Sequence, residues 1–273
     1  MATATGTALY PALRDLGWYD LLTGDDTAEI AVPLVFRLLG ETGSHAPLIN
    51  DVVARAADRP FGQAIPLPFT GGTWVRWDPE ADPAPEMLDP ELPLYRLGDI
   101  TELPTAAATV PLESARRALG WWLTGSARAM LGLARTHALE REQFGRPVAG
   151  FQAIRHRLAE TLVAIEGAEA TLALVPDDAH HPAHADIAAH RPDRYDSLGA
   201  SLAKAAAGRA ALLTARNCQQ VLGGIGFTAE HEFHRHYRRV LVLDGLLGSA
   251  RDLTREAGAT LRELGYAPRL AHL

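Results

Sequence analysis

Cysteine is almost absent from this chain, because Cys218 is the only cysteine among 273 residues. One cysteine cannot form an intramolecular disulfide, and it excludes a metal site built from several thiolates. We expect Cys218 to be a small buried hydrophobic residue.

Long apolar runs are missing too. No run approaches the roughly 20 apolar residues that cross a bilayer. The N-terminus lacks the basic and then apolar segments of a signal peptide. These absences predict a cytoplasmic protein with no membrane span.

Positive charge is not in excess, because the 26 Lys and Arg residues are outnumbered by 33 Asp and Glu residues and the formal net charge is −7. Nucleic-acid-binding domains usually carry a basic patch, whereas the basic residues here are scattered, so no nucleic-acid partner is expected. Hydrophobic residues, at 47%, are ample for a large core.

Three segments differ in composition, and we predict three domains from them. Residues 1–58 should form a partial N-terminal helical domain, with one short helix before Gly24 and a second helix from about Asp26. Gly40 and Gly43 are plausible stops for the second helix. Its apolar residues at helical spacing are Ile30, Leu34, Leu38 and Leu39.

Residues 59–110 hold 9 of the 18 prolines and should form a reduced middle β segment. Alternation predicts a strand over 73–77 and a loop over 79–93. Residues 111–273 should form a C-terminal helical bundle. The expected helices are 112–141, 151–175, 195–222, one from about residue 229 and one from about residue 249, with a loop at 176–192. The sequence therefore predicts a mainly α fold with a C-terminal four-helix bundle.

The first motif runs from Arg141 to Pro147 and reads Arg-Glu-Gln-Phe-Gly-Arg-Pro. An arginine at a helix C-terminus can simply complement the helix dipole. Its guanidinium can equally bind a pyrophosphate, and Phe144 could pack against a flat ring. Both interpretations stay open from the residues alone.

The second motif includes Gln220 and Gly223-Gly224-Ile225-Gly226. A helix C-cap explains one or two of these glycines. Three glycines within four residues favour a close approach of the backbone to another group.

The order and spacing of the two motifs resemble the C-terminal helical domain of acyl-CoA dehydrogenases over residues 111–264, and residues 12–50 look like the family's N-terminal helices. The resemblance implies that FAD lies across a dimer interface. It places the first motif at the pyrophosphate and adenosine and the second at the adenine. The implied cofactor-binding residues are Arg141, Gln143, Phe144, Phe151, Gln152, Gln220, Leu222, Gly223 and Gly224.

The family's reaction needs a carboxylate base, and the two positions that the resemblance gives for it are Leu247 and Ala115. Neither side chain can accept a proton, so no catalytic residue is expected. Asp244 and Glu113 are the nearest carboxylates to these positions and stay open as substitutes.

Some actinobacterial family members that act on steroid-CoA side chains pair two unlike subunits, and this chain resembles the subunit without the base. The resemblance implies a full-length acyl-CoA dehydrogenase partner in an α2β2 heterotetramer, an acyl-CoA substrate, and transfer of electrons to an electron-transfer flavoprotein. Two alternatives stay open: a scaffold subunit without flavin, and a homodimer with altered activity.

A metal enzyme is a further alternative, because the chain has 11 histidines. The densest group, from His231 to His236, is not a His-Glu-x-x-His motif because residue 235 is arginine. No second cluster has ligand spacing, so we expect structural roles and no metal. The remaining group, expected to lie in a solvated loop, is His180, His181, His184 and His190.

Overall fold

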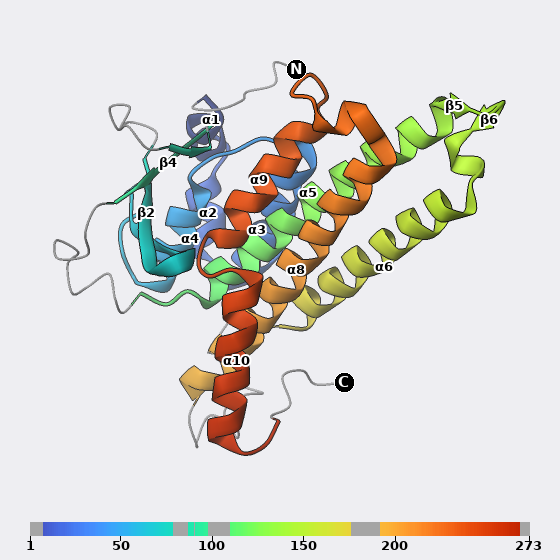
Figure 1. Cartoon of the computed structure of the whole chain (residues 1–273). Coiled ribbons are helices and arrows are strands. Elements are labelled where there is room, and N and C mark those ends of the chain that lie inside the picture. Colours follow the sequence, from blue (N-terminus) through green and yellow to red (C-terminus); the bar gives the residue numbers. More distant parts are fainter. Residues whose placement is uncertain (1–7, 79–86, 90, 98–109, 176–191, 268–273) are drawn as a thin grey trace.

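A computed structural model describes residues 8–78, 87–89, 91–97, 110–175 and 192–267 of the chain (Figure 1). It begins with the short helices α1 (Leu9–Asp15) and α2 (Trp18–Thr23), where the sequence predicted one helix. The break falls at Gly17, whose φ of 93° is left-handed, a conformation that glycine adopts at little cost. Helices α3 (Asp25–Thr42) and α4 (Leu48–Ala56) follow.

Helix α3 confirms the predicted second helix, and Gly43 ends it with a φ of 64°. Gly40 does not end the helix, because it lies within α3 where α3 crosses the long helix α5 (Glu113–Glu140). A Cβ atom at Gly40 would lie 2.5 Å from the backbone nitrogen of Ser126, so the two backbones touch there. This contact selects the buried face of α3, which consists of Ala28, Ala31, Val32, Phe36, Leu39 and Gly40.

Four short strands form an antiparallel sheet in the order β1-β2-β4-β3. The predicted strand 73–77 is confirmed as β2 (Thr73–Trp77), and β1 (Pro66–Phe69) pairs with it. The predicted loop 79–93 is wrong where β3 (Met87–Asp89) and the start of β4 (Leu92–Arg96) lie. Residues 79–86 and 90 lie outside the described residues. Proline is uncommon in an inner strand, so Pro93 argued against a strand at this position. Leu92 and Leu94 on either side of it are nevertheless fully buried.

The C-terminal segment confirms the helical bundle. Around α5 lie α6 (Gln152–Leu174), α8 (Pro192–Leu222) and α9 (Phe233–Gly245), and α10 (Ala250–Leu264) packs on α8. Figure 1 shows α5 and α8 running side by side, with α6 along them. Buried alanines of α8 allow a close approach of its backbone to neighbouring helices: Ala203, Ala207, Ala211 and Ala215. Residues 176–191, where the loop histidines were expected, lie outside the described residues.

One aromatic group connects the sheet to the helices. Trp77 of β2 stacks on Trp122 of α5 with ring centroids 5.6 Å apart, and Phe36 of α3 meets Trp122 edge-on at 5.8 Å. All three side chains are buried, so the N-terminal helices, the sheet and the bundle share one core. Within the described part of the chain, no helix has both the length and the apolar character needed to cross a membrane.

Candidate functional site at the tip of the bundle

A two-stranded hairpin carries the first motif beyond the end of α5. Its strands are β5 (Glu142–Gln143) and β6 (Arg146–Pro147), and the turn between them contains Phe144 with a φ of 55° and Gly145 with a φ of 76°. Two successive left-handed residues suit a tight hairpin turn, but a non-glycine residue pays roughly 1–2 kcal/mol for that conformation. The Phe144 side chain is also 92% exposed. Such backbone strain together with an exposed aromatic ring is typical of a binding surface.

The base of the hairpin is held in place by short-range contacts. The Val148 backbone N–H donates to the Arg141 carbonyl oxygen at 2.8 Å. The Phe151 ring lies 4.2 Å from the Arg146 guanidinium carbon and 6.1 Å, edge-on, from the Phe144 ring. Phe151 therefore packs against the base of the hairpin and stabilises it. The other side chains predicted from this motif, all exposed, are Arg141, Gln143 and Gln152.

The second motif ends α8 in a short 3-10 helix, η7 (Gly223–Phe227). Gly223 has a φ of 63°, and a Cβ atom at Gly223 or Gly224 would meet no heavy atom within 4 Å. These two glycines thus leave open space, whereas a Cβ atom at Gly226 would lie 3.0 Å from the Gln219 carbonyl oxygen. Gln220 is exposed, but the Leu222 side chain is buried in the core, so only its backbone could face a ligand.

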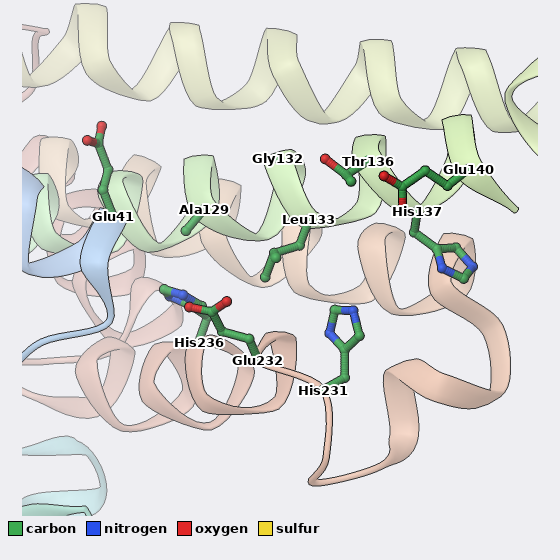
Figure 2. A pocket seen from close by; sticks show the side chains of 10 residues that line it. All are labelled: Glu41, Ala129, Gly132, Leu133, Thr136, His137, Glu140, His231, Glu232 and His236. Carbon is green, nitrogen blue, oxygen red and sulfur yellow. The ribbon is translucent and has the colours of Figure 1, made fainter.

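The two motifs approach the same end of the bundle (Figure 1). His137, about one turn before Arg141, and His231, just after the glycine turn, line one cavity of about 390 Å³. Figure 2 shows the two imidazole rings projecting into it from α5 and from the segment before α9. Burial, followed by the proximity of His231, lowers the pKa of His137. No sequence motif marked His137, and it was not predicted.

His231 has a structural role that the sequence did not reveal. Its Nδ1 atom accepts a hydrogen bond from the Phe233 backbone N–H at 3.1 Å and so satisfies a free donor at the start of α9. Helix α9 begins at Phe233 and not near residue 229 as predicted. Among the described residues, no three His, Cys, Asp or Glu side chains converge as a metal site.

The first base position, Leu247, is closed off from solvent. Its side chain is 0% exposed, its φ is 58°, and its backbone N–H donates to the Pro68 carbonyl oxygen at 2.8 Å. Phe69 and Leu246 pair in a single β-bridge beside this bond. Strand β1 therefore covers the loop that follows α9. The second base position, Ala115, is 1% exposed in the core.

The carboxylate of Asp244 is engaged in the bundle. It accepts a hydrogen bond from the Ala250 backbone N–H at 3.1 Å, at the start of α10. Burial raises the pKa of Asp244, and Lys204 lies nearby as an opposing charge. Its geometry is that of a helix cap. Glu113 is partly buried in the first turn of α5.

Comparisons with known proteins agree with this architecture. Residues 105–251 match the model of the family described as acyl-CoA dehydrogenase, C-terminal domain. The chain is 31% identical to acyl-CoA dehydrogenase FadE34 of Mycobacterium tuberculosis, over 98% of this chain and 36% of the relative. It is 31% identical to acyl-CoA dehydrogenase IpdE2 of the same organism, over 70% of this chain and 55% of the relative.

Among solved structures, a steroid ACAD variant, Tcur3481-Tcur3483, is 29% identical with a TM-score of 0.48, covering 64% of this chain and 44% of that chain. This chain spans only 36% of the FadE34 length and 55% of the IpdE2 length.

Proposed function

Because the chain belongs to the acyl-CoA dehydrogenase family, we propose that it acts as a subunit that completes the flavin site of a full-length partner. The proposal rests on a contrast between two places in the chain: the surface with the cofactor motifs and the position expected for the base. The surface with the cofactor motifs is exposed, whereas Leu247, at the position of the base, is buried under β1. The chain can thus contact a cofactor but offers no proton acceptor at either base position.

The tip of the bundle suits the ADP half of FAD. The exposed Arg141 guanidinium can pair with a pyrophosphate, the Phe144 ring presents a flat apolar surface, and the open space at Gly223 and Gly224 admits a ligand close to the backbone. When bound, FAD supplies the hydride acceptor of the reaction. This chain would hold and orient the adenosine end and exclude water from it.

The proposed reaction is α,β-dehydrogenation of a CoA thioester, with the base supplied by the partner subunit. In FadE34, nearly all of this chain matches 36% of the polypeptide, so the equivalent unit there is covalently joined to a much longer chain. A separate partner would provide here what the rest of FadE34 provides there. We propose an α2β2 assembly and an electron-transfer flavoprotein as the electron acceptor, both on the family resemblance.

The decisive measurement is the visible absorbance of the chain, purified alone and then co-expressed with the full-length acyl-CoA dehydrogenase encoded nearest to it in its genome. The expected result is a colourless chain and a yellow complex with about one flavin per pair of unlike chains. A chain that is yellow alone would favour the homodimer. A colourless complex would favour the alternative of a scaffold subunit that binds its partner without flavin.

A substitution locates the flavin contact. Arg141→Ala should lower the flavin content of the purified complex while the two chains still co-purify. Arg155→Ala is the matched control, because Arg155 is another exposed arginine, located on α6. Equal flavin content in both variants would contradict the role of Arg141.

A further inference from the structure

Arg146 belongs to the first motif but was not among the predicted cofactor-binding residues. It is exposed on β6, and its guanidinium carbon lies 4.2 Å from the centre of the Phe151 ring. A guanidinium over an aromatic face is attracted to the ring electrons and still has N–H groups that can bind another group. Phe151 therefore holds the Arg146 charge in place at the end of the bundle.

The register of the hairpin places Arg146 on the same face as two residues of the predicted cofactor site. Arg146 pairs directly with Gln143, and paired side chains lie on one face of a two-stranded sheet. Arg141 is extended, with a φ of −77° and a ψ of 118°, and it lies two residues before Gln143. Its side chain therefore points to that face too. The two arginines are diagonal neighbours, whose Cα atoms are about 7–8 Å apart in such a pair.

The hairpin lies next to the N-terminus of α6, as Figure 1 shows. Phe151 is the residue directly before α6, so the ring contact brings Arg146 to the start of this 23-residue helix. A helix N-terminus carries a partial positive charge. In the part of the chain that the structure describes, the first turn of α6 has no acidic residue and no side chain caps it. Arg146 thus adds to the positive charge of the helix end.

The glutamates closest in sequence to the two arginines do not neutralise them. Glu142 pairs with Pro147 and therefore lies on the opposite face of the hairpin. Glu140 ends α5 and lines the cavity between α5 and the segment before α9. Across the described ranges, neither arginine forms an ion pair with a carboxylate. The two guanidiniums and the start of α6 therefore form a positive surface on a chain whose formal net charge is −7.

We propose that Arg146 is the second cation of a diphosphate site, and that Arg141 and Arg146 each pair with one phosphate of the FAD pyrophosphate. The charges select this occupant, because a pyrophosphate diester carries one negative charge on each phosphate and each guanidinium can form a charge-assisted pair with one of them. A single carboxylate would leave one arginine unpaired. Phe151 acts through Arg146 and is a positioning residue. This assignment rests on the proposed function, since it adds a residue to the same flavin surface.

Binding of ADP and of adenosine to the flavin-depleted complex of the two unlike chains tests the assignment. ADP carries the diphosphate and adenosine does not. Arg146→Ala should weaken ADP binding roughly tenfold and leave adenosine binding unchanged, because only a phosphate contact is lost. Arg146→Lys should recover part of the ADP affinity. Phe151→Leu should weaken ADP binding less than Arg146→Ala does, because the arginine stays but loses its support.

Arg155→Ala is the matched control, because it removes one exposed positive charge from the first turn of α6 and leaves the hairpin intact. Its affinity for ADP should equal that of the wild type. An Arg146→Ala complex that binds ADP as tightly as the wild type would overturn the assignment. Equal weakening of ADP and adenosine would also overturn it, because that result indicates a structural role for the arginine. Loss of co-purification in Arg146→Ala would mean that this arginine pairs with the partner protein instead.

Failure of the proposed function would look different. A wild-type complex that binds neither FAD nor ADP would refute the flavin role of the whole surface, and the role of Arg146 with it. A complex that loses flavin in Arg141→Ala but keeps it, with full ADP affinity, in Arg146→Ala would refute only the second cation.

Discussion

The backbone N–H of Leu247 donates to the carbonyl oxygen of Pro68 at 2.8 Å, and this bond joins the loop after α9 to strand β1. A Cβ atom at Gly245, two residues earlier, would lie 2.5 Å from the Phe69 ring. Loop and strand therefore pack without room for a substrate. A carboxylate at residue 247 would be buried, and its side chain would not reach an acyl-CoA unless β1 moved.

Leu247→Ala should destabilise the chain without affecting proton abstraction. Removing a fully buried leucine side chain typically costs about 2–5 kcal/mol. Thermal unfolding should show this loss, and Leu241→Ala, at a 50% exposed position on α9, should show little change. Exchange of the substrate α-proton by the assembled complex should continue at the wild-type rate. A collapse of that exchange in a folded, flavin-loaded complex would contradict the expectation that Leu247 has no part in proton abstraction.

Phe144→Gly should affect stability and flavin binding differently. Glycine relieves the strain at a φ of 55°, roughly 1–2 kcal/mol, and this gain offsets the lost ring contact with Phe151. The melting temperature of the chain alone should stay equal or rise. Flavin affinity of the complex should fall roughly tenfold, because stacking on an aromatic ring contributes about 1–3 kcal/mol per base.

Tyr266→Ala provides the control for that experiment, since Tyr266 is 55% exposed and lies after α10. A Phe144→Gly complex that retains full flavin affinity would show that the exposed ring serves another contact.

Local sequence signals predicted much of this fold because they act within a few residues. Ser249 precedes α10 and caps it through the Asp252 backbone N–H, as expected for a helix predicted from about residue 249. Strand 73–77 was predicted correctly from alternation. The motifs at Arg141 and Gly223 each lie at a turn after a helix, and the structure brings both turns to one end of the bundle.

Features that depend on packing between distant segments could not be predicted. The buried face of α3 is fixed by the crossing with α5 at Gly40, and the large residues Ile30 and Leu34 therefore face outward. The cavity between His137 and His231 likewise needs α5 and the segment before α9 in place. The closure over Leu247 depends on a strand about 180 residues earlier, which no spacing in the sequence reveals.

Asp51→Ala should strongly destabilise the N-terminal helices. The Asp51 carboxylate is fully buried and accepts hydrogen bonds from the Tyr10 hydroxyl at 3.0 Å, the Trp18 indole N–H at 3.0 Å and the Gly62 backbone N–H at 2.9 Å. Of these three donors only the Trp18 N–H is buried, and leaving a buried donor without an acceptor costs about 1–3 kcal/mol. The bonds from the half-buried Tyr10 and the exposed Gly62 add less, so the expected loss is at least about 1–3 kcal/mol.

Urea unfolding measures this loss, and Asp20→Ala is the control at an exposed position of α2. The stability of Asp51→Asn, which keeps one acceptor oxygen, should lie between the stabilities of Asp51→Ala and Asp20→Ala. Equal stability of all three variants would mean that water replaces the carboxylate.

Lys204 should make the stability of the chain depend on pH in a particular window. Its side chain is fully buried, and its Nζ atom donates to the carbonyl oxygens of Asp244, at 2.9 Å, and Gly248. Burial lowers the pKa of Lys204 to about 7, whereas an unfolded lysine has a pKa of about 10.4. Between these two values the unfolded chain binds more protons than the folded chain. The free energy of unfolding should therefore rise with pH from about 7 towards about 10, with no contribution to the slope below that window.

Lys204→Met isolates this effect, because methionine fills similar space and does not titrate. Urea unfolding of both proteins at pH 6, 7.5 and 9 gives the difference in stability between wild type and variant. That difference should shift in favour of the wild type as pH rises from 7.5 to 9, because the wild type no longer has to keep a buried ammonium charged. A difference that stays constant over the window would mean that the two carbonyls stabilise the charged lysine as well as water does. In that case Lys204 would hold the loop after α9 as a permanent cation.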